Sequence, residues 1–266
     1  MNSSLPLLNY KIFSPEDKEK QNNTPLLILH GLLGSQDNWR SQARKLSASR
    51  PVITLDLRNH GNSPHIKGMS YREMYEDVIK VAQHEGLSQF HLLGHSMGGK
   101  VAMQLALAHS ELVKSLIVVD IAPKPYPLWH QNTLQAIMSI PETSMVTRQT
   151  VDEYLKKSID DETERRFMLK NLKRNPDGSG FSWQVNLEEI SRGYLKIAGF
   201  STALETYKGK TLFIRGDYSQ YILESDTTLI HSLFPQASII SMKKSGHLPH
   251  FQQAEEFFEN ITHFLK

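Results

Sequence analysis

A serine lies at the centre of the motif Gly94–Gly98 (G-H-S-M-G), and a serine hydroxyl attacks an acyl carbonyl when a neighbouring base removes its proton. The motif follows the apolar run Phe90–Leu93 and precedes a run with helical spacing, Lys100–His109. In the order strand, G-x-S-x-G, helix, the serine stands on a sharp turn and its hydroxyl projects from the edge of a sheet. The glycines leave room, because a side chain there would collide across the bend. The spacing therefore predicts that Ser96 is a nucleophile.

A histidine later in the chain would serve as the base. His247 lies in the segment Ser245–His250, after the last expected strand and before the last expected helix. This position fits the chain order serine, acid, histidine. His250 is the second candidate, and we interpret it as a loop histidine that orients its neighbours.

Backbone N–H groups are the candidates for holding the negative charge that develops on the substrate oxygen. Met97 begins the helix after the serine, so its N–H can point at that charge. The second donor is expected in the loop His30–Leu32, which ends an early strand, and we choose the Leu32 N–H, with Leu33 as the alternative. Removing one such donor costs about 3–4 kcal/mol in the transition state. We interpret His30 as holding this loop through hydrogen bonds.

Other polar residues are expected to have structural roles. Asp56, Arg58 and Ser63 are interpreted as a buried network that fixes the loop beside the pocket. The chain contains no H-E-x-x-H motif, no G-x-G-x-x-G motif and no P-loop, so neither a metal nor a nucleotide cofactor is expected.

The composition narrows the class of protein. The 266 residues suffice for one large domain with an insertion, and the formal net charge of +2 disfavours a nucleic-acid partner. The absence of cysteine excludes disulfides and thiolate chemistry. No apolar run is long enough to span a membrane, and Met1–Ser14 does not resemble a signal peptide. A cytoplasmic protein without an integral membrane segment is expected.

Apolar runs alternate with amphipathic runs, which indicates a mostly parallel sheet covered by helices on both faces. Strands and helices are expected at these ranges: strands at 10–13, 26–29, 52–55, 90–93, 115–120, 211–215 and 237–241, and helices at 37–49, 71–85, 100–109, 224–234 and 254–265.

The alternation stops at Ile121–Pro127, where three prolines interrupt regular structure. From there to about residue 207 the pattern is helical without a clear buried strand, with helices expected at 129–139, 146–158, 162–173 and 186–195 and a turn at 175–180. We therefore expect a core of residues 1–121 and 208–266, and a helical cap of residues 122–207 over the active edge of the sheet.

The chain resembles the α/β-hydrolase superfamily over nearly its whole length, and within it the bacterial YbfF-type esterases most. The motifs that carry the resemblance are His30-Gly31, Asp56-x-Arg58-x-x-Gly61-x-Ser63, Gly94–Gly99 and Gly246-His247, together with Leu55–Gly61, Gly94–Lys100 and Asp120–Pro123 for the narrower likeness. The resemblance implies an α/β-hydrolase fold with an eight-stranded, mostly parallel sheet and a helical cap inserted after strand six.

The acid that orients the histidine is where this chain departs from the common superfamily pattern. There the acid usually closes a G-x-x-D corner after strand seven, whereas the corner Gly216–Ser219 ends here in serine. Asp217 is two residues earlier, and a tight turn would aim its side chain elsewhere. Asp120 ends strand six, and the family fold sets strands six and seven side by side, about 4.8 Å apart. Because YbfF-type esterases place their acid in the Asp-Ile-Ala-Pro segment, the resemblance favours Asp120, with Asp217 as the alternative.

The main hypothesis is a serine hydrolase that cleaves carboxylic esters or thioesters of small to medium acyl groups, acyl-CoA among them, through an acyl-enzyme on Ser96. One alternative is an enzyme of the same fold with other chemistry, such as a C–C bond hydrolase or a cofactor-free perhydrolase. Another is a non-catalytic hydrolase fold that only binds a ligand, which Ser219 in the usual acid position would fit. The sequence does not indicate the oligomeric state.

Overall fold

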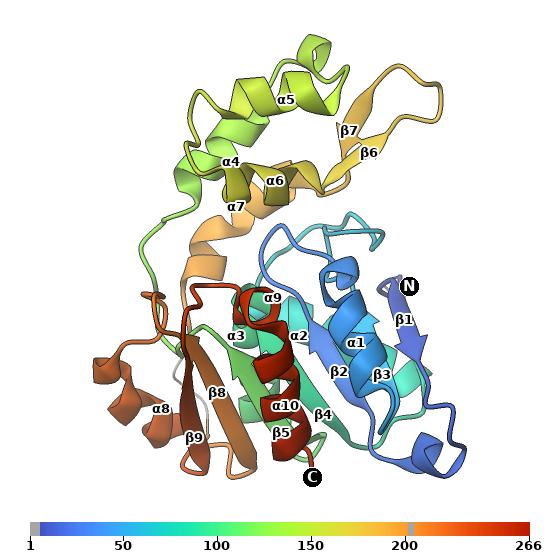
Figure 1. Ribbon diagram of the computed structural model, residues 1–266, viewed down its shortest axis with the longest axis vertical. Coiled ribbons are helices and arrows are strands. Elements are labelled where there is room, and N and C mark those ends of the chain that lie inside the picture. Colours follow the sequence, from blue (N-terminus) through green and yellow to red (C-terminus); the bar gives the residue numbers. More distant parts are fainter. Residues whose placement is uncertain (1–5, 202–204) are drawn as a thin grey trace.

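A seven-stranded sheet lies at the centre of the computed structural model, which describes residues 6–201 and 205–266 (Figure 1). In spatial order its strands are β1 (Tyr10–Phe13), β3 (Val52–Leu55), β2 (Leu26–Leu29), β4 (Phe90–His95), β5 (Val113–Val119), β8 (Lys210–Gly216) and β9 (Ala237–Met242). β1 runs antiparallel to β3, and every other neighbouring pair in this sheet is parallel. The α/β-hydrolase fold class predicted from the sequence is confirmed.

The central strands read as continuous apolar runs because both of their faces are buried. In β2, Leu27 and Leu29 belong to the hydrophobic core on one face of the sheet, and Leu26 and Ile28 belong to the core on the other. All four side chains are inaccessible to solvent.

Helices cover both faces. The core helices are α1 (Arg40–Leu46), α2 (Tyr71–His84), α3 (Met97–Ala108), α8 (Thr227–Leu233), α9 (Pro249–Gln252) and α10 (Ala254–Phe264). α2 and α3 pack on one face, and α1 and α10 on the other. α3 is buried over nearly its whole length, which explains why it lacks a polar stripe. None of the helices described combines the length and the apolar composition that a membrane crossing needs.

The sheet has seven strands in the described residues, one fewer than the resemblance to the superfamily implied. Between β1 and β2 the chain forms turns and a 3-10 helix, Glu19–Asn22. This segment, 14–24, is almost entirely polar and charged, so it offers no apolar alternation from which a further strand could form. The seven strand-forming runs in the sequence match the seven observed strands.

The chain leaves the sheet after β5 and returns at β8, and the intervening elements lie above the carboxyl ends of the strands (Figure 1). They are α4 (Gln131–Met138), α5 (Arg148–Leu155), α6 (Glu162–Leu169), β6 (Leu172–Arg174), β7 (Phe181–Trp183) and α7 (Leu187–Ala198). We propose residues 122–207 as a cap unit and use the word cap for this range; positions 1–5 of the core range and 202–204 of the cap lie outside the described residues.

The cap also contains a small antiparallel hairpin of β6 and β7, where the sequence indicated no clear strand. The helix expected to reach Lys173 ends at Leu169. The turn expected at 175–180 joins the two strands of the hairpin. With three residues each and partly exposed side chains, these strands are too short to produce a recognisable period in the sequence.

Candidate active site

Ser96 stands between β4 and α3 with a backbone φ of 52°, a conformation that costs a non-glycine residue about 1–3 kcal/mol. The turn is tight, because a Cβ at Gly94 would lie 2.2 Å from the Gly98 carbonyl oxygen. A Cβ at Gly98 would lie 2.4 Å from the carbonyl oxygen of His30. The Ser96 N–H donates to the carbonyl of Val119 at 3.0 Å, which fixes the turn against β5.

His247 connects the serine to a carboxylate. Its Nε2 lies 2.9 Å from Ser96 Oγ, and its Nδ1 lies 2.8 Å from Asp120 Oδ2. A carboxylate accepts hydrogen bonds, so Nδ1 carries the ring hydrogen and Nε2 can accept the proton of the Ser96 hydroxyl. The histidine is therefore held in the tautomer that a general base needs.

Asp120 directly follows β5, and its side chain is fully buried. Its backbone adopts a φ of 53°, and its N–H donates to the carbonyl of Ile214 on β8 at 2.8 Å. The Gly216 N–H donates to Oδ1 at 2.9 Å, and the Ser219 hydroxyl donates to Oδ2. These hydrogen bonds orient the carboxylate toward His247 and give both of its oxygens a partner.

Asp217, the alternative acid, is exposed at the start of the loop after β8. Across the described chain, no hydrogen bond or ion pair joins its carboxylate to His247. Ser219, which occupies the usual acid position, donates its hydroxyl to the Asp120 carboxylate. The geometry thus brings Asp120, and not Asp217, to the imidazole.

Two groups that the sequence did not single out fix the His247 ring. Tyr221 stacks on it, with 3.8 Å between ring centroids and 20° between ring planes. The Tyr221 hydroxyl is 3.0 Å from Nε2 of His130, a residue of the cap. His95 donates from Nε2 to the backbone carbonyl of His247 at 2.7 Å. Burial lowers the pKa of His95, so this ring acts as a neutral donor at ordinary pH.

The two expected oxyanion donors lie beside the serine. Leu32, Ser96 and Met97 line one small cavity of about 40 Å³. Among the loop hydrogen bonds of the described residues, none uses the Leu32 N–H, which is therefore available to a ligand. The neighbouring Leu33 has a φ of 56°, and its carbonyl accepts from Nδ2 of Asn171 at 2.8 Å. A cap residue therefore helps to hold the loop in which the oxyanion donor is expected.

His30 and His250 lie in structural positions. The Nδ1 of His30 bonds the Gly31 carbonyl at 2.8 Å, and its Nε2 accepts from the Leu57 N–H at 2.9 Å, so the ring ties two loops together. His250 is buried and stacked on Trp39, with 4.2 Å between ring centroids. Burial lowers the pKa of His250 to about 3.

The polar residues after β3 form the expected buried network. The Ser63 hydroxyl donates to the backbone carbonyl of Asp56 at 2.5 Å, and the Gln36 N–H donates to the Asp56 carboxylate at 2.7 Å. Arg58 pairs with Asp77 at 2.6 Å, and both side chains are 2% exposed. These contacts engage the Asp56 carboxylate, the Ser63 hydroxyl and the Arg58 guanidinium in holding the loop. In the described residues, no three His, Asp or Glu side chains are arranged to hold a metal ion.

Lys100 anchors the cap to the core and was also missed from the sequence. Its Nζ donates to the carbonyls of Ala198 and Gly199 at 2.9 and 2.8 Å, at the carboxyl end of α7. A cation is favourable there because the helix end carries partial negative charge. The ammonium also lies 4.7 Å from the centroid of the Tyr126 ring, and burial lowers the pKa of Lys100 to about 7. A lysine as the single charged residue of the helix α3 was the available signal.

Known proteins match this chain in sequence and in fold. A family model described as the alpha/beta hydrolase fold matches residues 24–254. The chain belongs to the α/β-hydrolase family. This hydrolase is 37% identical to a sn-1-specific diacylglycerol lipase ABHD11 of Danio rerio, over 97% of the chain and 82% of the relative. It is 30% identical to the esterase YbfF of Escherichia coli, over 93% of the chain and 95% of the relative.

A solved structure of a marine microorganism esterase superposes on this hydrolase with a TM-score of 0.92 and 36% identity, covering 98% of the chain and all of the esterase. The expected relation to YbfF is confirmed. Because these relatives and the structural neighbour bear the names of ester-cleaving enzymes, the comparisons support a hydrolase.

Proposed function

We propose that this protein is a serine hydrolase that cleaves carboxylic esters or thioesters through an acyl-enzyme on Ser96. The hydrogen-bond chain from Ser96 Oγ through His247 to the buried Asp120 is the observation on which this proposal rests. The names of the relatives support the ester class of substrate.

In the proposed reaction, His247 Nε2 takes the proton of Ser96 as its Oγ attacks the acyl carbonyl. The buried Asp120 stabilises the imidazolium that results. The Leu32 and Met97 N–H groups would hold the oxyanion, each contributing about 3–4 kcal/mol. His247 then protonates the leaving alcohol or thiol, and water repeats the sequence on the acyl-enzyme.

The space beside Ser96 sets the expected substrate size. The cavity of about 40 Å³ is bordered on the cap side by Trp129, His130 and Tyr194. A volume of this size admits little more than a water molecule or a methyl group. Short acyl groups should therefore react with little movement of the cap, whereas long acyl groups require it to open. The name of the Danio rerio relative adds diacylglycerol to the candidate substrates, beside the acyl-CoA thioesters expected from the sequence.

A panel of substrates tests the proposal. Nitrophenyl esters of increasing chain length, short and long acyl-CoAs, and a diacylglycerol are offered to the wild type and to Ser96→Ala. We expect ester hydrolysis that falls by about 10⁴-fold or more in the variant. A fluorophosphonate should label the wild type and not Ser96→Ala. Failure of the wild type to react with both esters and fluorophosphonate would refute the proposal and favour a fold that only binds its ligand.

A further inference from the structure

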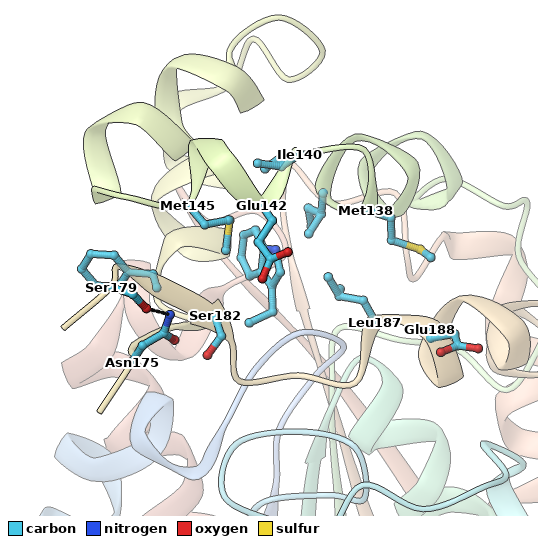
Figure 2. Close-up of a pocket in the computed structure, with 12 residues that line it drawn as sticks. Met138, Ile140, Glu142, Met145, Asn175, Ser179, Ser182, Leu187 and Glu188 are labelled. Carbon is cyan, nitrogen blue, oxygen red and sulfur yellow. Dashed lines mark hydrogen bonds between the residues drawn. The ribbon is translucent and has the colours of Figure 1, made fainter. Parts of the chain in front are cut away.

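The cap contains a second cavity, of about 550 Å³ and open to solvent on one side, between α4, the hairpin β6–β7 and the start of α7 (Figure 2). Its volume lies within the range of about 300–1,000 Å³ that is usual for small-molecule sites. All of its lining residues fall between Ile137 and Glu188, and it shares none of them with the cavity at Ser96.

Buried side chains separate the two cavities. α4 and α7 pack against each other, and Leu134 and Ile190 lie between their two ends with 2% and 0% exposure. His130 and Tyr194 border the cavity at Ser96, about two helical turns from Ile137 and Leu187 at the other. A molecule in the cap cavity therefore occupies a site of its own.

One side of the cap cavity suits an aliphatic chain. Its apolar lining comes from α4, the segment after it, β7 and α7, and includes Ile137, Ile140, Met145, Phe181, Trp183 and Leu187. Methionine is flexible and adapts to chains of different shape. Two isoleucines and a leucine supply branched aliphatic surface, which carries no hydrogen-bonding group that a hydrocarbon would leave unsatisfied.

The other side suits hydroxyl groups. Asn175, Ser179, Ser182 and Glu142 bring amide, hydroxyl and carboxylate groups to the cavity, and Figure 2 shows the Glu142 side chain extending from the 3-10 helix Glu142–Ser144 toward its middle. Asn175 Nδ2 donates to the Ser179 hydroxyl, and that hydroxyl donates to Asp177. The Ser182 hydroxyl and the Glu142 carboxylate are the groups that a polyol can match with its own hydroxyls.

The charges at the cavity disfavour an anionic head group. The lining contains two carboxylates, Glu142 and Glu188, and no basic side chain. Glu188 pairs with Arg192 at 2.6 Å, whereas no ion pair of Glu142 is present in the described part of the chain. Arg148 and Arg174 stack on the Phe181 ring, each at 5.4 Å, but neither lines the cavity. The carboxylate of a free fatty acid would meet Glu142 as a like charge.

We propose that the cap cavity binds a single-chain amphiphile with an uncharged polyol head, of the monoacylglycerol class, with its chain against Ile137 and Leu187 and its hydroxyls against Glu142 and Ser182. This site is separate from the one at Ser96 and does not depend on the reaction proposed for it.

Calorimetric titration tests the site with three ligands of equal chain length: monodecanoylglycerol, decanoate and decylammonium, each below its micelle concentration. Ser96→Ala serves as the background, so that no ligand is hydrolysed. We expect monodecanoylglycerol to bind more tightly than decanoate, by about tenfold, the ratio that corresponds to about 1.4 kcal/mol. Stronger binding of decanoate or decylammonium would overturn the assignment of an uncharged head group.

Two further variants in this background locate the ligand. Ser182→Trp places a large side chain in the cavity and should weaken the binding of monodecanoylglycerol by about tenfold or more. Ser158 is another exposed serine of the cap and does not line the cavity, so Ser158→Trp should leave the binding of monodecanoylglycerol unchanged. Glu142→Gln keeps the shape and hydrogen-bonding capacity of the side chain but removes its charge. It should strengthen the binding of decanoate and change the binding of monodecanoylglycerol less. Circular dichroism verifies that each variant is folded. Binding that is indifferent to both Ser182→Trp and Glu142→Gln would refute the site.

Discussion

Replacing Asp120 with asparagine should remove most of the activity while leaving the shape of the site intact. Two unit charges separated by the 2.8 Å between His247 Nδ1 and Asp120 Oδ2 attract by about 6 kcal/mol at an effective dielectric constant of about 20. The His247 side chain is 27% exposed, so solvent reduces this value to about 4–5 kcal/mol. The attraction acts fully only when the imidazolium forms, which happens in the transition state. Losing this attraction in Asp120→Asn therefore corresponds to a fall in kcat of about 10³- to 10⁴-fold.

The assay is steady-state hydrolysis of a short nitrophenyl ester, with Asp217→Asn as the matched control. Asp217 is exposed and has no hydrogen bond to His247 in the described residues, so the control should retain activity within about twofold of wild type. Near-normal kcat in Asp120→Asn together with a large loss in Asp217→Asn would show that the hydrogen-bond geometry does not identify the acid.

Three further perturbations probe the surroundings of the site. Tyr221→Leu removes the ring stacked on His247 and should lower kcat about 2- to 10-fold. Tyr221→Phe keeps the stacked ring and should lower kcat less, so equal losses of kcat in the two variants would contradict a role for stacking. Gly98→Ala should destabilise the fold by about 3 kcal/mol or more, measured by urea unfolding, because its Cβ would lie 2.4 Å from a backbone oxygen. Lys100 has a pKa of about 7 when folded and 10.5 as its ordinary value, so the unfolded chain binds more protons between these pH values. Its contribution to stability should rise with pH through this window, by about 1 kcal/mol per unit, and urea unfolding at pH 7 and pH 9 should show this rise in wild type but not in Lys100→Met.

The sheet could be predicted because its strands are buried on both faces. Leu26–Leu29 and Val52–Leu55 are continuous apolar runs bounded by turn residues, and such runs need no knowledge of their neighbours to be recognised. The turn at Ser96 could be predicted equally well, because the local backbone leaves no room for a side chain at its glycines. The hairpin of the cap lacked any such local signature, because its two strands are defined by their pairing with each other.

The site could be predicted from the sequence only in part, because some of its contacts depend on which distant strands lie side by side. The sequence favoured Asp120 over Asp217 mainly through family likeness, since nothing near either residue shows which strand ends beside His247. Tyr221 stacks on that ring from a loop of unremarkable composition, and no spacing along the chain encodes the contact. Lys100 carried a local signal, a charge within an apolar helix, but its partners at Ala198 and Gly199 were unknown without the fold.

The place at which the cap enters and leaves the core has an evolutionary consequence. β5 and β8 are adjacent and parallel, so the excursion starts at the carboxyl end of β5 and finishes at the amino end of β8, at the opposite edge of the sheet. A lineage could exchange this module for one of another size by recombination without disturbing the register of the sheet. Asp120 directly follows β5, so an exchange confined to residues 122–207 would replace the cap and leave the proposed acid in the core.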